Sequence, residues 1–263
     1  MAQTSLEERM VAVPTQVRRR KSGLPLLAIL VVLVAALVVA DRLAAAAATD
    51  RIRTQVVSAL AKHDVQPRST EVSVDGFPFL TQVADGRYEQ ITIDMTGVAY
   101  SGVVLPSLLV VAHGVRADAA DIIGRSVTAT ADRVTGTAVV DWPTLTSLVD
   151  YARLGLTDVR FAAVDGALEV VGTANINGVR VPLAALADLS VKAGVVQVSL
   201  RDARIGGAGI AGLGQAQVNA LLRSLTVPVP IPPLPFRLAI DAVQVQPLGL
   251  TVTGTARGVS LVS

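Results

Sequence analysis

The chain has 263 residues, of which 51% are hydrophobic and 3% aromatic, with a formal net charge of +2 and no Cys. Five cationic and two acidic residues precede residue 41, which leaves residues 41–263 with 18 of the 23 Lys and Arg, 19 of the 21 Asp and Glu, and a net charge of −1. A near-neutral, aromatic-poor chain lacks the basic surface and stacking residues of nucleic-acid binding proteins, and the absence of Cys excludes disulfides and a thiol nucleophile.

The first 40 residues have the pattern of a membrane anchor. Residues 23–40, GLPLLAILVVLVAALVVA, carry no charge. As a helix they would cover ~27 Å, close to the ~30 Å hydrocarbon core of a bilayer. A basic run at 18–21 precedes them, so the positive-inside rule predicts a cytoplasmic tail at 1–22, a single-pass anchor in the plasma (inner) membrane at 23–40, and an exported, periplasmic domain at 41–263. A cleaved signal peptide is the alternative, because the Ala-rich stretch 43–48 offers small-residue cleavage sites.

A helix is predicted for residues 41–62. Ile52, Val56 and Leu60 repeat at i, i+4 and i+8 and form one apolar stripe. We expect this stripe to pack on the exported domain. A helix lying on the membrane surface is the alternative, because the other faces carry cationic residues.

An unusually apolar turn is expected between residues 75 and 86. Its apolar side chains include two of the four Phe residues of the chain, and they belong to Phe77, Pro78, Phe79 and Leu80. Turns normally face water and carry polar residues. We therefore expect this turn to contact the protein's own core, a lipid or a partner.

From residue 70 onward the hydrophobic period changes to two, which predicts half-buried strands. Short turns rich in Gly, Asp and Asn separate these segments and favour antiparallel connections. The alternating segments are 71–75, 91–96, 127–131, 167–170, 179–181, 196–200, 238–245 and 250–253.

Two further helices and a Pro-rich connector are predicted among the strands. Asp141 is a suitable N-cap, and Pro143 suits the first turn of a helix in which Trp142 would be a core anchor. A second helix is expected at 213–225. The five Pro residues of 226–235 exclude a helix or a central strand and favour an extended polyproline connector. The fold class is therefore α+β with a large antiparallel sheet; a curved sheet wrapped around a helix and a flattened barrel both fit.

No catalytic constellation is evident in the sequence. The two His residues, His63 and His113, stand in no metal-binding pattern, and no GxSxG or Walker motif occurs. The Gly-rich segment 206–212 lacks the Lys-Ser/Thr pair of a phosphate loop and is interpreted as a flexible link. The sequence predicts a binding protein rather than an enzyme, with no metal and no cofactor.

An exported, neutral and aliphatic domain is suited to binding a lipid. Sugar sites usually stack rings on Trp or Tyr, which are scarce here, whereas acyl chains need only dry aliphatic area, at ~0.8 kcal/mol per buried CH₂. Phe77, Pro78, Phe79 and Leu80 are our candidate lipid-binding residues, either at the rim of an aliphatic cavity or in contact with the bilayer. The alternative is that Phe77 and Phe79 pin the turn to the core.

Several segments resemble the LmeA-like phospholipid-binding proteins of actinobacterial cell envelopes. The similarity covers most of residues 41–260. The segments that carry it are Gly76–Thr81 with Gly86–Tyr88, Asp41–Arg42, Asp141–Pro143, and Leu234–Phe236 leading into Gly249–Val252.

The resemblance implies a membrane-tethered periplasmic protein that binds phospholipid, with a curved sheet around a helix as in proteins of the bactericidal/permeability-increasing type. The mycobacterial member supports the mannan chain of lipomannan and lipoarabinomannan, which implies a role in lipoglycan assembly or envelope maintenance, with a phospholipid or lipoglycan precursor as partner. It assigns no catalytic residue. The alternative function is a non-catalytic scaffold that recruits an envelope glycosyltransferase through a sheet edge or the Pro-rich connector.

Overall fold

The structure is a computed structural model of the whole chain, which separates into two compact units, Met1–Ala40 and Asp41–Ser263. The predicted helix at 213–225, the Gly-rich link from 207 on and the connector from 230 to 235 lie outside the described residues. The structure describes residues 23–62, 64–100, 103–118, 128–148, 151, 156–176, 179–192, 194–206, 226–229 and 238–262.

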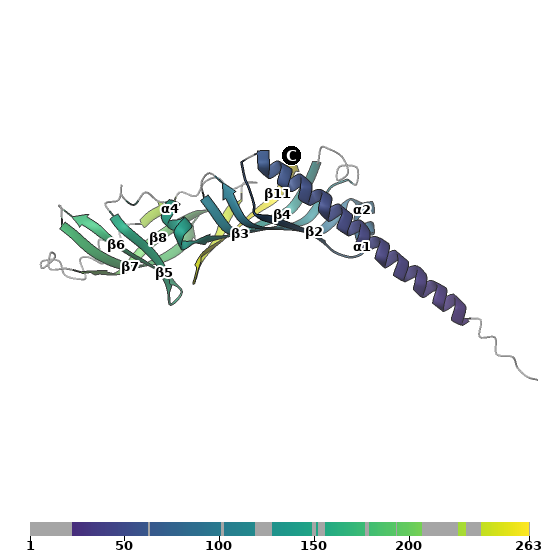
Figure 1. Cartoon of the computed structure of the whole chain (residues 1–263), viewed down its shortest axis with the longest axis horizontal. Coiled ribbons are helices and arrows are strands. Elements are labelled where there is room, and N and C mark those ends of the chain that lie inside the picture. Colours follow the sequence, from purple (N-terminus) through teal and green to yellow (C-terminus); the bar gives the residue numbers. More distant parts are fainter. Residues whose placement is uncertain are drawn as a thin grey trace, which may run out of the picture. The chain divides into compact units, whose positions relative to one another are not determined.

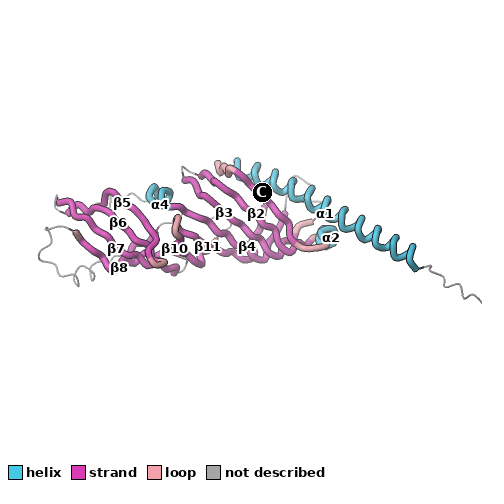
Figure 2. The backbone as a smooth tube through the Cα atoms, turned by 60° about the horizontal axis from the view of Figure 1, so that its bottom comes forward, coloured by secondary structure: helices cyan, strands magenta, loops and turns pink. Residues whose placement is uncertain are grey.

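The second unit is built from two antiparallel sheets (Figures 1 and 2). The six-stranded sheet has the order β1 (Ser69–Asp75), β2 (Arg87–Tyr100), β3 (Val103–Arg116), β4 (Thr128–Asp141), β11 (Gly249–Val262) and β10 (Ala239–Gln246). The five-stranded sheet has the order β5 (Leu156–Val164), β6 (Ala167–Ile176), β7 (Val179–Lys192), β8 (Val195–Ile205) and β9 (Thr226–Val229). The helices among the described residues are α1 (Gly23–Lys62), α2 (Phe79–Asp85) and α4 (Trp142–Leu148).

The helices predicted at 23–40 and 41–62 are a single helix, α1. No Gly or Pro separates them, and the junction is rich in Ala, the strongest helix former. From Leu30 on, α1 is long and apolar enough to cross a membrane, with a mean hydropathy of 2.3. By length and composition, this N-terminal helix suits a membrane anchor or a signal sequence.

In the second unit, α1 packs on the six-stranded sheet through small side chains. Ala44, Ala45 and Ala48 lie against the core of the sheet, while the predicted stripe at Ile52, Val56 and Leu60 is half-buried. The α+β fold with an antiparallel sheet packed around a helix is confirmed. The sheet is not closed into a barrel within the described residues, because β1 and β10 form its two edges.

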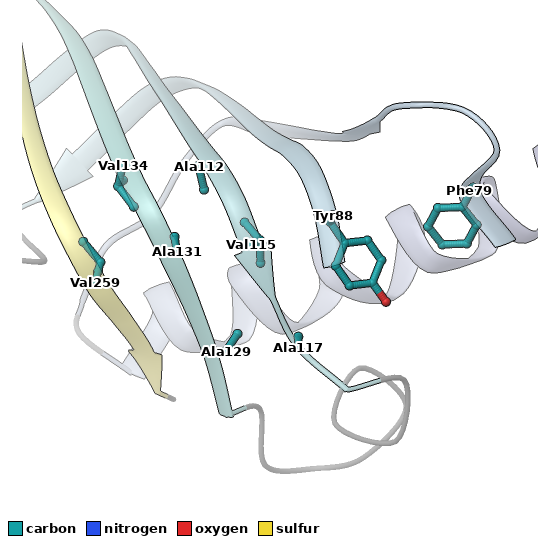
Figure 3. Packing of buried hydrophobic residues seen from close by; sticks show 9 residues of the cluster. All are labelled: Phe79, Tyr88, Ala112, Val115, Ala117, Ala129, Ala131, Val134 and Val259. Atoms are coloured by element: carbon teal, nitrogen blue, oxygen red, sulfur yellow. The ribbon is translucent and has the colours of Figure 1, made fainter. Parts of the chain in front are cut away.

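A core cluster of the second unit lies on one face of the six-stranded sheet and consists mainly of Ala and Val (Figure 3). Other buried side chains, such as Leu168 and Ala187, belong to the five-stranded sheet. Val115 and Val134 have the largest fully buried side chains. The members of this core are Phe79, Tyr88, Ala112, Val115, Ala117, Ala129, Ala131, Val134 and Val259.

Two glycines let the sheet keep one apolar face where regular alternation would break it. In β3, Ala112 and Val115 both belong to the core, although residues three apart along a regular strand face opposite sides. Gly114 between them has a φ of 61°, and Gly258 in β11 has a φ of 60°. At each of these glycines the alternation of side chains between the two faces of the sheet is shifted by one residue. A strand pattern that alternates every second residue therefore does not predict which side chains face the core on both sides of the glycine.

The junction around α4 follows the predicted start of the helix. The backbone N–H of Thr144 donates to Asp141 Oδ1 over 2.9 Å, as expected of an N-cap. Trp142 is half-buried and lies outside the core cluster, which corrects its predicted role as a core anchor. Its indole N–H donates to the carbonyl of Pro247 over 3.1 Å, and its ring lies 6.3 Å from that of Phe161.

The start of the Pro-rich segment forms a strand instead of a polyproline connector. Residues Thr226–Val229 are β9, which pairs with β8 so that Val229 lies opposite Val196. β9 is the last strand of its sheet in the described part of the chain. Pro228 is compatible with this position, because a residue without an N–H is tolerated in an edge strand.

Candidate functional site

The apolar turn between β1 and α2 depends on a glycine at its first position. Gly76 has a φ of 104°, and a Cβ there would lie 2.5 Å from Gln82 Nε2. The peptide bond between Phe77 and Pro78 is cis, and Pro78 precedes the first residue of α2. The segment therefore leaves β1, turns sharply at residues 76–78 and enters α2.

The turn directs its apolar side chains to opposite sides. Phe79 is 4% exposed and belongs to the core, where its ring centroid lies 6.2 Å from that of Tyr88 (Figure 3). Phe77 and Leu80 are 56% and 45% exposed, and Pro78 is also exposed. Phe79 thus anchors the turn, while its two neighbours present apolar surface to solvent.

Gln82 fixes the turn to the two strands that flank it. Its Nε2 donates to the carbonyl of Asp75 in β1 over 3.3 Å, and its Oε1 accepts from the backbone N–H of Glu89 in β2 over 2.9 Å. The Gln82 side chain is buried. Because both ends of its amide are used, the exposed residues of the turn stand on a rigid base.

Asp41 of α1 makes the connection from the other side. It is 3% exposed, and its Oδ1 accepts a hydrogen bond from the backbone N–H of Leu80 over 2.8 Å. Its Oδ2 and the hydroxyl of Tyr88 are buried without a hydrogen-bond partner among the described residues. Burial raises the pKa of the Tyr88 phenol above its ordinary value of 10.0.

Arg42, the next residue of α1, covers the exposed aromatic ring of the turn. Its guanidinium carbon lies 4.9 Å from the centroid of the Phe77 ring, within the range of a cation–π interaction. The side chain is exposed and makes no salt bridge within the described part of the chain. We call Arg42, Phe77, Pro78 and Leu80 the Phe77 tip.

The Phe77 tip combines exposed apolar side chains with a cation at their edge. Such a surface matches the boundary between hydrocarbon and head groups, where aromatic rings and long cationic side chains are favoured. It offers no nucleophile and no acid–base pair. In the described ranges, no group of three or more His, Asp or Glu residues could hold a metal ion.

A pocket of about 490 Å³ lies elsewhere in the second unit. Its lining mixes aliphatic side chains of β10 with Asp165, Asp188 and Arg201. Arg201 Nε is 2.8 Å from Asp188 Oδ2, and Arg201 Nη1 is 2.7 Å from Asp202 Oδ2, so its charge is already paired. This lining is not the aliphatic wall that an acyl chain requires; the aliphatic cavity stays a prediction.

The structure divides the four predicted site residues. It gathers Phe77, Pro78 and Leu80 on the exposed side of the turn, and it places Phe79 in the core. Sequence reasoning did not find the roles of Asp41 and Gln82. The sequence offers one signal for Asp41, because it is the only carboxylate between the apolar run and Asp50.

The sequence model of one family, described as LmeA-like phospholipid-binding, matches residues 39–255. This range contains the Phe77 tip together with Asp41 and Gln82. Searches of curated proteins and of solved structures give no match. The chain belongs to the LmeA-like phospholipid-binding family.

Proposed function

We propose that this phospholipid-binding protein contacts the membrane lipid through the Phe77 tip, with residues 23–40 as its anchor and residues 41–263 as an exported domain. The observation that carries the proposal is the division of the turn: Phe79 is held in the core, and Phe77 and Leu80 are held outward. Two large apolar side chains exposed on one short turn present more apolar surface than a single exposed residue such as Leu248, and removing that surface from water is favourable.

The energy of this contact is small and suits a tethered protein. Complete burial of one such side chain contributes about 1.5–3 kcal/mol, so two half-exposed ones contribute roughly 2 kcal/mol. An interaction of this size is weak between separate molecules. An anchor in the same chain would make it effective, since tethering replaces the bulk concentration with a high local one.

The position of Arg42 in the sequence supports the same contact. Arg42 follows Ala40 by two residues, so an anchor at 23–40 would bring Arg42 close to the end of the hydrocarbon core. Because Arg42 lies on Phe77, the tip would then be at the level of the head groups. The basic run at 18–21 favours an orientation with the N-terminus in the cytoplasm.

A cysteine-free chain permits a direct test of the contact. The full-length variant Leu80→Cys, labelled with an environment-sensitive fluorophore, is reconstituted in nanodiscs that contain brominated phospholipid. We expect strong quenching at position 80 and weak quenching for Leu248→Cys, a control at an 80% exposed apolar residue of the β10–β11 turn. Equal, weak quenching at both positions would contradict the proposed lipid contact.

At the level of the cell, the proposed role is support of lipoglycan assembly or envelope maintenance, with a phospholipid or lipoglycan precursor as ligand. Family membership supports the lipid part of this role. The test is the lipoglycan profile of a deletion strain complemented with the wild type or with Phe77→Asp/Leu80→Asp. A normal lipoglycan profile with the double variant would show that the cellular role does not require the Phe77 tip.

The alternative is a scaffold for an envelope glycosyltransferase. The observation that favours it is β9, an edge strand in the described part of the chain, which leaves one side of its backbone available for pairing with another chain. A photo-crosslinker at Val227, compared with one at Leu80, decides between the two. Crosslinking to one protein from Val227 alone would favour the scaffold.

A further inference from the structure

The guanidinium of Arg42 is held by its contact with the Phe77 ring, but no carboxylate of the described residues neutralises its charge. It lies 4.9 Å from the centroid of the Phe77 ring, and no carboxylate pairs with it in the described residues. The adjacent carboxylate, Asp41, is 3% exposed and accepts the backbone N–H of Leu80. Asp41 therefore holds the turn against α1, and the Arg42 charge stays available to an external anion.

The contact with Phe77 leaves N–H donors of the guanidinium open, because Arg42 has no hydrogen-bond or ion-pair partner in the described part of the chain. A guanidinium is planar and carries five N–H donors in that plane. A single aromatic ring cannot occupy all five of these donors. The fork of donors matches the two free oxygens of a phosphodiester, as it matches a carboxylate.

We propose that Arg42 is the phosphate-binding residue of the Phe77 tip and selects phospholipids with a net negative head group. This inference rests on the proposed lipid contact, because the contact brings Arg42 to the level of the lipid phosphates. In a zwitterionic lipid the phosphate is already paired with its own cationic head group. An anionic lipid such as phosphatidylglycerol has no such internal partner and gains more from Arg42.

The expected selectivity is modest. Exposed ion pairs contribute about 0.2–1 kcal/mol, which corresponds to roughly 1.5- to 5-fold in occupancy. Salt screens such a pair, because the Debye length falls from about 10 Å at 0.1 M to about 3 Å at 1 M. Both the enrichment and its dependence on salt are measurable.

The experiment uses the full chain in nanodiscs made of equal amounts of phosphatidylglycerol and phosphatidylcholine. Native mass spectrometry of the released protein gives the ratio of the two lipids retained. We expect the wild type to retain more phosphatidylglycerol, Arg42→Gln to retain the two lipids equally, and the matched control Arg51→Gln to behave like the wild type. Arg51 is an exposed cation of the same helix.

Two results would overturn the assignment of Arg42: equal enrichment in the wild type and Arg42→Gln, or an enrichment in the wild type that high salt leaves unchanged. The labelled position 80 separates this failure from a failure of the proposed function. If position 80 is quenched by lipid while Arg42→Gln has no effect, the tip contacts the membrane and Arg42 does not select the lipid. If position 80 is not quenched, the lipid contact itself is wrong.

Discussion

Asp41 Oδ1 accepts a hydrogen bond from the backbone N–H of Leu80 over 2.8 Å and ties the first turn of α2 to α1. The two residues are 39 positions apart in the sequence. Phe79, the neighbour of Leu80, is buried in the core, and Arg42, the neighbour of Asp41, covers the ring of Phe77. The bond therefore helps to hold the turn in the arrangement in which Phe79 is buried and Phe77 is exposed.

Replacing the acceptor should loosen the turn. In Asp41→Ala the N–H of Leu80 loses its partner, and we expect the free energy of unfolding to fall by about 1 kcal/mol. Urea denaturation measures this loss, and hydrogen exchange should show faster exchange at the Leu80 amide. The control is Asp50→Ala, which removes an exposed carboxylate of the same helix and should change stability by less than about 0.5 kcal/mol. Unchanged protection at Leu80 would show that Asp41 does not hold the turn.

The two Phe residues of the turn should respond in opposite ways. Phe79→Ala removes a buried ring from the core and should lower the free energy of unfolding by about 3–5 kcal/mol. Phe77→Ala removes an exposed ring and should change it by about 0.5 kcal/mol or less. Urea denaturation of both variants is the measurement. Equal losses would mean that both rings pack in the core and would remove the basis of the Phe77 tip.

Gly76 should tolerate no side chain, for two separable reasons. Its φ of 104° disfavours any L residue, and the Cβ of Ala would lie 2.5 Å from Gln82 Nε2. Gly166→Ala is the matched control, because Gly166 has a φ of 76° and nothing within 4 Å of a Cβ. We expect Gly76→Ala to lower stability by at least about 1 kcal/mol more than Gly166→Ala, since it also disturbs the partly buried hydrogen bond from Gln82 to the carbonyl of Asp75. Equal losses would show that the Gln82 contact contributes nothing.

Stability should fall in alkali because of Tyr151. Burial raises the pKa of its phenol to about 12 from 10.0. The unfolded chain loses this proton near pH 10 while the folded protein keeps it, so the stability from this group is complete below about pH 10 and is lost as the pH rises towards about 12.

Urea denaturation of the wild type and Tyr151→Phe across this pH range tests the assignment. The Phe variant also loses a 3.3 Å hydrogen bond from Tyr151 Oη to the carbonyl of Leu145, so it should be less stable at neutral pH and less sensitive to alkali. A part of the pH dependence should remain, because burial also raises the pKa of Tyr88. Identical slopes in the two proteins would contradict the role of Tyr151.

Much of the fold follows from local pattern. Alternation in segments such as 91–96 and 250–253 predicts strands that the structure contains, because a half-buried strand needs apolar residues on one face only. Pattern fails at Gly114 and Gly258, where positive φ values shift the alternation. It also fails at Thr226–Val229, because whether a Pro can join a sheet depends on which edge is available.

The sequence by itself determined the apolar N-terminal segment, the α+β class, the family and the unusual turn at 77–80. Each of these is a property of composition or of residues close together in the chain. Only the tertiary structure decided that Phe79 is buried and that Phe77 and Leu80 are exposed. The physical reason is that this choice depends on Asp41, which lies 39 residues from Leu80 in the sequence, and on the contacts of Gln82 and Tyr88, which form only when α2 is packed against β1 and β2. A run of four apolar residues is locally the same whichever side chain the core accepts, and the contacts that distinguish them exist only in the folded chain.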